Sequence, residues 1–112
     1  MIEKTLYDYL NAKLTVPAYM ELPADGYPSS YVLIEKTGSS RENRIDRATV
    51  AIQSIAPTLY EAAVLNEHVK GAMDDAVELG DISRVELNSD YNFTDQTKKE
   101  YRYQAVFDIV HY

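Results

Sequence analysis

The chain has 112 residues, a formal net charge of -7 and 46% hydrophobic residues, so it fits one soluble domain, residues 1–112. No apolar run approaches the ~20 residues of a membrane-spanning helix, and the absence of cysteine excludes disulfides, thiolate metal sites and a thiol nucleophile. The negative charge argues against nucleic-acid binding. Residues 1–5 lack the pattern of a secretory signal, which together with the absence of cysteine leads us to expect an intracellular protein.

The first half of the chain predicts a helix followed by three strands. Residues 2–14 carry apolar side chains on one helical face, and Pro17 ends the helix. The pattern then indicates a short strand at 18–22, a turn at 23–30, a strand at 31–37, a polar loop at 38–46 and a strand at 47–56. The last two strands form a hairpin with a long tip in this interpretation.

The second half predicts the longest helix and two more strands. Pro57 suits a first helical position, and Gly80 is well placed to end the helix. A strand at 81–91, a polar turn at 92–99 and a closing strand at 100–112 follow. The closing strand alternates in character, with the polar residues Arg102, Gln104 and Asp108 on one face. Its other face is apolar and carries Tyr101, Tyr103, Ala105, Phe107 and Ile109.

The order αβββαββ predicts an α+β fold with an antiparallel or mixed β-sheet and two helices packed on one face. Small residues on the long helix would let it lie close to the sheet: Ala62, Ala63, Ala72 and Ala76. The sheet would supply the larger core side chains: Val50, Ile52, Val85, Leu87, Phe107 and Ile109.

Candidate reactive groups are few. His68 and His111 are far apart in the sequence, and no nucleophile motif or Gly-rich phosphate loop accompanies them, so we expect neither an enzyme nor a cofactor. Four acidic residues crowd the end of the long helix: Asp74, Asp75, Glu78 and Asp81. Their oxygens could hold a hard cation, but their spacing matches no calcium-loop pattern, which favours a solvated acidic edge or one that meets a basic partner.

Two basic groups stand out against this acidic background. Arg41, Arg44 and Arg47 lie in and after the loop at 38–46, either as a hydrated mobile tip or as a contact for the acidic helix end of a neighbouring copy. A second basic group, at the opposite hairpin tip, comprises Lys98, Lys99 and Arg102. Ten tyrosines further favour an interface, where this residue type is enriched.

Short segments along most of the chain occur in an order that resembles a known family. They are LYDYL at 6–10, VPAY at 16–19, YVLIEKTG at 31–38, TVAIQS at 49–54, LYEAA at 59–63, TDQT at 94–97 and YRYQAVFDI at 101–109. In their order and residue character they resemble the tail terminator, or tail completion, proteins of long-tailed bacteriophages and prophages.

The resemblance implies a structural protein of the virion that forms an oligomeric ring, commonly a hexamer. Such a ring caps the tail tube, ends tube polymerisation and provides the head-joining surface. The implied partners are copies of the chain itself, the tail tube protein and head–tail connector proteins. The resemblance also implies that the chain assembles in the host cytoplasm and lies in the neck of the virion. The ring forms in solution or only on docking. The alternatives are another neck or head–tail joining protein, or a small ligand-binding α+β domain.

Overall fold

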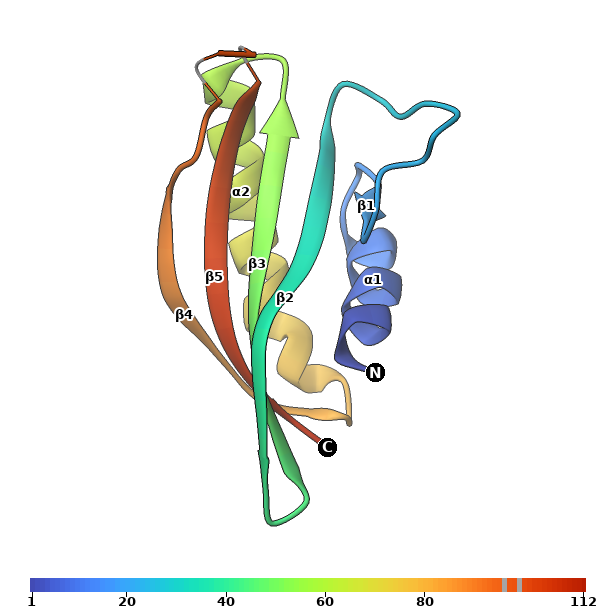
Figure 1. Cartoon of the computed structure of the whole chain (residues 1–112), viewed down its shortest axis with the longest axis vertical. Helices are drawn as coiled ribbons and strands as arrows, with labels where there is room; N and C mark the ends of the chain where they lie inside the picture. The colour runs from blue at the N-terminus through green and yellow to red at the C-terminus, as the bar shows by residue number, and fades with distance from the viewer. Residues whose placement is uncertain (96, 99) are drawn as a thin grey trace.

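The computed structural model describes residues 1–95, 97–98 and 100–112, and in these residues two helices lie against one face of a five-stranded sheet (Figure 1). The elements are α1 (Ile2–Lys13), β1 (Ala18–Tyr19), β2 (Tyr31–Glu42), β3 (Ile45–Ala56), α2 (Leu59–Asp74), the 3-10 helix η1 (Asp75–Glu78), β4 (Ile82–Asn92) and β5 (Tyr101–His111). The sheet order is β1-β2-β3-β5-β4, with β1 parallel to β2 and the other neighbours antiparallel. The α+β class is confirmed.

The polar segment 38–46 is not a long loop, so this prediction is wrong. β2 continues to Glu42 and β3 begins at Ile45, directly opposite, which leaves a turn of two residues. These residues, Asn43 and Arg44, have φ angles of 53° and 68°. Positive φ at both central positions is typical of the tight turns whose twist matches that of a hairpin, and Asn tolerates this region well. The segment escaped detection because both of its faces are exposed, and a strand without a buried face shows no alternation.

Other boundaries also differ from expectation. β1 has two residues instead of the predicted 18–22. α2 begins after Thr58, whose hydroxyl accepts a hydrogen bond from the backbone N–H of Glu61 at 3.1 Å, so Pro57 precedes the helix cap. α2 ends at Asp74 and continues as η1, well before Gly80.

The core lies between the helices and the face of the sheet that they cover. Ala105, Phe107 and Ile109 of β5 are buried, as the alternation of the closing strand predicts, and Phe107 is paired with Val50 of β3. The helices contribute further buried residues: Leu6, Leu10, Ala62, Val69, Met73 and Ala76. Burying each large apolar side chain contributes about 1.5–3 kcal/mol.

The edge of the sheet departs from the predicted core. Leu87 of β4 is 46% exposed and Val85 is half-buried. β4 is an edge strand, whereas α2 lies behind β3 and β5 (Figure 1), so the side chains of β4 are not covered to the same extent. On α2, Ala63 and Ala72 are half-buried, and Ala72 packs against the core.

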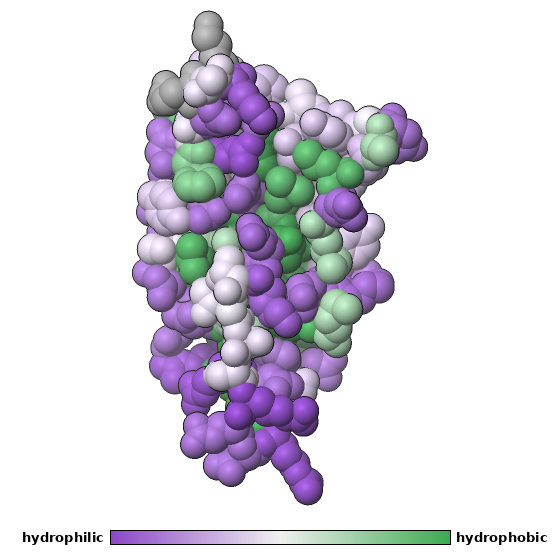
Figure 2. Space-filling model, viewed as in Figure 1, coloured by the Kyte–Doolittle hydropathy of each residue, from purple (hydrophilic) through white to green (hydrophobic). Residues whose placement is uncertain are grey.

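The second face of the sheet points away from the helices and towards the viewer in Figures 1 and 2. Figure 2 shows apolar surface among polar rows on this face. At one end of it Tyr31 and Ile55 are paired, and each is only 4% exposed. The rings of Tyr19 and Tyr27 pack on Tyr31, with centroids 6.2 and 5.0 Å from its own. A cluster of tyrosines therefore shields this end of the second face.

Candidate interaction surfaces

The first candidate surface is the arm, defined as residues 38–47, in which the end of β2 pairs with the start of β3. It extends beyond the helical layer (Figure 1), and the side chains of Arg41, Arg44 and Arg47 are exposed. The pairs Ser40↔Arg47 and Arg41↔Asp46 are adjacent in the ladder, so Arg41 and Arg47 point to opposite faces of the ribbon. The predicted arginine cluster is therefore spread around the arm and does not form a single patch.

The arm is a paired two-stranded ribbon. Arg41 Nε lies 3.5 Å from Asp46 Oδ1 across the two strands. On its other side β3 remains paired with β5 as far as Asp46↔His111, which supports one flank of the arm. An exposed ion pair of this kind adds at most ~1 kcal/mol, so the turn and the ladder set the direction of the arginines.

The acidic residues Asp74, Asp75 and Glu78 are exposed at the end of α2 and in η1. Among the described residues no ion pair joins them to the arm, and no group of acidic or histidine side chains there could hold a metal ion. Two of them act on Tyr9 of α1, whose hydroxyl donates to the carbonyl oxygen of Ala72 at 2.7 Å. Burial chiefly, and then Asp75 and Glu78, raise the pKa of Tyr9.

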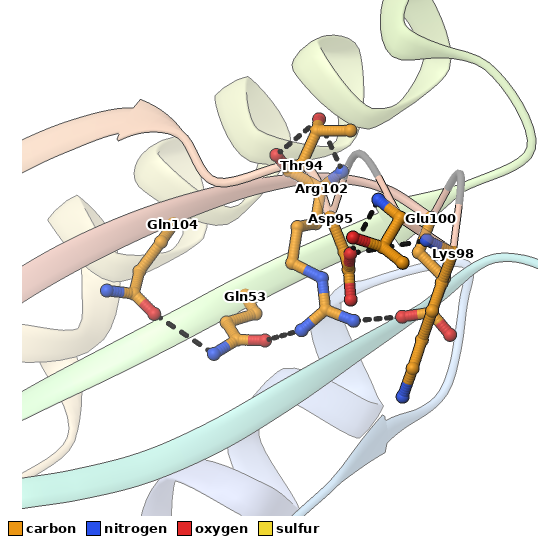
Figure 3. Close-up of polar contacts among 8 residues, drawn as sticks. Gln53, Thr94, Asp95, Lys98, Glu100, Arg102 and Gln104 are labelled. Carbon is orange, nitrogen blue, oxygen red and sulfur yellow. Dashed lines mark hydrogen bonds and ion pairs between the residues drawn. The ribbon is translucent and has the colours of Figure 1, made fainter.

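Of the second predicted basic group the structure describes Lys98 and Arg102, and these two do not form a joint cationic patch. Lys98 is exposed, whereas Lys99 lies outside the described residues. The guanidinium of Arg102 is held within its own chain, donating to Gln53 Oε1 at 2.7 Å and to the carboxylate of Glu100 (Figure 3). Lys98 is therefore the exposed cation that the structure places at this tip.

Arg102 begins a polar chain that crosses the sheet face opposite the helices. Gln53 Nε2 donates to Gln104 Oε1 at 3.0 Å, and Gln104 Nε2 donates to the hydroxyl of Tyr91 at 2.5 Å. The links run from β5 to β3, back to β5 and on to β4 (Figure 3 shows the first part). Sequence reasoning missed this network, because only the pairing of β3 with β5 brings Gln53 opposite Gln104.

Tyr31, beside this network, has a raised pKa. Burial is the largest cause, Glu100 and Tyr27 act in the same direction, and Arg102 acts in the opposite one. The neutral phenol is therefore favoured, which suits a side chain that packs under other rings.

Further along the same face, Asp108 receives two hydrogen bonds. Thr49 Oγ1 donates to Asp108 Oδ1 at 3.1 Å, and Asn88 Nδ2 donates to Asp108 Oδ2 at 3.0 Å. An open depression of about 460 Å³ adjoins this carboxylate, with Arg47 and Arg84 among its lining residues. Its polar and charged lining suits a protein surface better than an apolar small molecule.

The histidines do not form a joint site. His68 is exposed on α2 and borders a groove of about 280 Å³, whereas His111 is half-buried at the end of β5 and borders a different depression near the arm. A proton-transfer role would need a second group within hydrogen-bond reach, and the hydrogen bonds found in the described residues give neither imidazole a side-chain partner.

The sequence was compared with protein-family models and with curated proteins. No protein-family model and no curated protein matches this sequence. Among the helices of the described residues, none has the length and apolar character needed to cross a membrane. The resemblance to tail terminators therefore stays a prediction.

Proposed function

We propose that this chain is a structural protein of a bacteriophage or prophage tail, a tail terminator that forms a ring, caps the tail tube and provides the head-joining surface. The observation that carries the proposal is the arm, because a paired ribbon presents arginines on two faces beyond the helical layer. The order of segments that resembles tail terminators supports it. This function acts through contacts and requires neither a catalytic group nor a cofactor.

A closed ring of identical copies needs two different patches that meet, one from each neighbour. Rotation about the ring axis keeps every patch at its own level along that axis. The arm extends beyond the end of α2 (Figure 1), so both patches lie towards the same end of the molecule, where neighbours in a ring can bring them together. Arginine forks suit carboxylates, and cations beside a helix C-terminus also relieve the unfavourable dipole interaction of Asp74 and Asp75.

The remaining surfaces suit the other proposed partners. The sheet face opposite the helices combines apolar surface with ordered polar rows, a mixture typical of interfaces between proteins that also exist separately (Figure 2). We assign the tail tube protein and the head–tail connector proteins to the two ends of the ring. Assembly would take place in the host cytoplasm, and the finished ring would lie in the neck of the virion.

The test is reconstitution with the tail tube protein encoded in the same tail-gene cluster. Sedimentation and native mass measurement of the chain alone and with tubes would report a ring, either free or formed on the tube. Electron microscopy should find the chain at one tube end, and tubes should stop growing when it is added. Tubes that elongate unchanged, with the chain absent from their ends, would overturn the proposal. Binding to isolated connectors but not to tubes would instead favour a head–tail joining protein.

A further inference from the structure

The groove beside α2 is apolar and has a charged rim. It lies between the N-terminal half of α2, the segment that follows α1 and the adjoining ends of β2 and β3, and it measures about 280 Å³. Val16, Ala56, Val64 and Leu65 provide its apolar lining. On the rim, Tyr60 is 78% exposed and Glu61 and His68 are also exposed. A small apolar recess with a polar rim is suited to receive one or two anchoring side chains of a protein partner.

A pair of aromatic rings elsewhere on the chain has the properties of such an anchor. Tyr91 and Phe93, at the end of β4 and just beyond it, are 41% and 45% exposed, and their rings meet edge-on with centroids 5.9 Å apart. The hydroxyl of Tyr91 is held by Gln104, and the backbone N–H of Phe93 donates to the carbonyl oxygen of Arg102 at 2.9 Å. The hydroxyl bond of Tyr91 and the contact between the two rings restrict both side chains, which lowers the side-chain entropy lost on binding.

The groove and the aromatic pair lie towards the same end of the long axis, where α2 begins and β4 ends (Figure 1). The aromatic pair belongs to the β4 edge of the sheet, and the groove opens between α2 and the segment after α1. Two patches at one level on different sides of a molecule can meet between neighbours related by rotation. Their charges also match, because Glu61 borders the groove and Lys98 lies in the turn that follows Phe93.

We infer that the groove beside α2 receives the Tyr91–Phe93 pair of a second copy of this chain, with Lys98 of one copy facing Glu61 of the other. The contact rests on the self-assembly proposed above and adds to it a hydrophobic anchor at the end opposite the arm. Each interface of the ring would then have two contacts, an ionic one at the arm and an apolar one beside α2.

The natural chain has no cysteine, so two introduced thiols report one contact. We would mix a Lys98→Cys chain with a Glu61→Cys chain under conditions of assembly, with tube protein present, and oxidise the mixture. The expected product is a covalent dimer of one chain of each kind, absent when either variant is oxidised alone. A mixture of Ile45→Cys and Glu61→Cys chains is the matched control, because Ile45 lies in the arm at the other end, and it should give at least tenfold less dimer.

A second variant tests the groove itself. Adding Val64→Arg to the Glu61→Cys chain should reduce the dimer at least tenfold, because a guanidinium would occupy the apolar recess. Met20→Arg in the same chain, at an exposed apolar position that lies outside the groove, the arm and the acidic end of α2, should leave the yield unchanged. Circular dichroism would verify that both variants fold.

The outcomes separate this inference from the proposed function. A dimer yield no higher than that of the Ile45→Cys control overturns the inference, and so does a yield that Val64→Arg leaves unchanged. If sedimentation still finds rings on tubes in that case, the proposed function stands without this contact. A specific dimer combined with tubes that are never capped would support the contact and overturn the function.

Discussion

Arg102 and Gln53 join the neighbouring strands β5 and β3 on the sheet face opposite the helices: Nη1 of the guanidinium donates to the side-chain oxygen of Gln53 at 2.7 Å. The residues are 49 positions apart in the chain. Arg102 is also directly opposite Ile55 in the ladder, so its stem lies beside a buried side chain on the sheet face that the helices do not cover. The same side chain thus satisfies polar groups and shields apolar ones.

Replacing Arg102 with Met should therefore lower the free energy of unfolding by about 1–2 kcal/mol, because Gln53 and Glu100 lose their charged donor while the apolar stem is kept. Urea unfolding followed by circular dichroism would measure the change. Lys98→Met, a change at an exposed side chain four residues before Arg102, should stay within about 0.5 kcal/mol. Equal effects of the two substitutions would mean that the network contributes nothing.

Arg44→Gly should raise the free energy of unfolding by about 0.5–1 kcal/mol, since Arg44 has a φ of 68° and glycine adopts this conformation without steric cost. Arg44→Val should have the opposite effect, because a branched side chain is most strained in this region. Urea midpoints of both variants would decide the matter. A turn that is insensitive to both changes would contradict the two-residue connection between β2 and β3.

Ser54 is a polar residue in the core, where its replacement can be tested. Its hydroxyl is buried and has no hydrogen-bond partner among the described residues, as is also true of the side-chain oxygen of Asn66. Ser54→Ala removes an unsatisfied polar atom, so stability should be unchanged or rise by up to about 1 kcal/mol. Ile52→Ala, on the same face of β3, should cost about 2–5 kcal/mol because it leaves a cavity. A loss above about 1 kcal/mol for Ser54→Ala would reveal a partner of its hydroxyl.

Alkaline pH should weaken the fold. The pKa values of Tyr9 and Tyr31 are raised chiefly by burial, and that of Lys70 is raised by its hydrogen bonds to Asp90 and Glu67. The folded chain thus holds these protons more tightly than the unfolded chain. Their contribution is fully present below the ordinary pKa values, about 10, and is lost as the pH rises through the higher values of the folded state.

The measurement is the free energy of unfolding between pH 8 and pH 11. It should fall steeply above about pH 10, and Tyr9→Phe should reduce that slope. At pH 8 the same substitution should cost about 1 kcal/mol, because it removes the hydrogen bond to the carbonyl oxygen of Ala72. A slope that is identical in the variant would show that Tyr9 ionises alike in both states.

Reversal of the arm's charge tests the proposed ring. Changing Arg41, Arg44 and Arg47 together to Glu should weaken assembly at least tenfold and leave the circular dichroism spectrum unchanged, because all three side chains are exposed. Light scattering would follow assembly. Converting Asp74, Asp75 and Glu78 to Lys in the same chain should restore it, which controls for damage to the fold. Unchanged assembly in the arginine variant would remove the arm from the interface.

The sequence predicts those parts of the fold in which one face is buried. β5 shows its alternation because Ala105, Phe107 and Ile109 face the core, and α1 shows its helical period because Leu6 and Leu10 do so. The arm has two exposed faces, and its pairing is set by the turn at Asn43 and Arg44, so local pattern could not identify it.

The candidate surfaces divide in the same way. The exposed positions of Arg41, Arg44, Asp74 and Asp75 follow from polar character alone. The engagement of Arg102 could not be predicted, because its partner is distant in sequence and becomes a neighbour only through the order β3-β5-β4. The groove beside α2 likewise combines residues from four separate segments.

The position of β5 has a consequence for biosynthesis. The ribosome makes this strand after α1, α2 and the other four strands described here, yet it lies in the sheet between β3 and β4. Until residues 101–111 emerge, the nascent chain has an open slot along β3 and lacks Phe107 at its centre. Translation must therefore proceed almost to the last residue of this sequence before the domain can close, and an interrupted message yields an exposed sheet edge instead of a smaller stable fold.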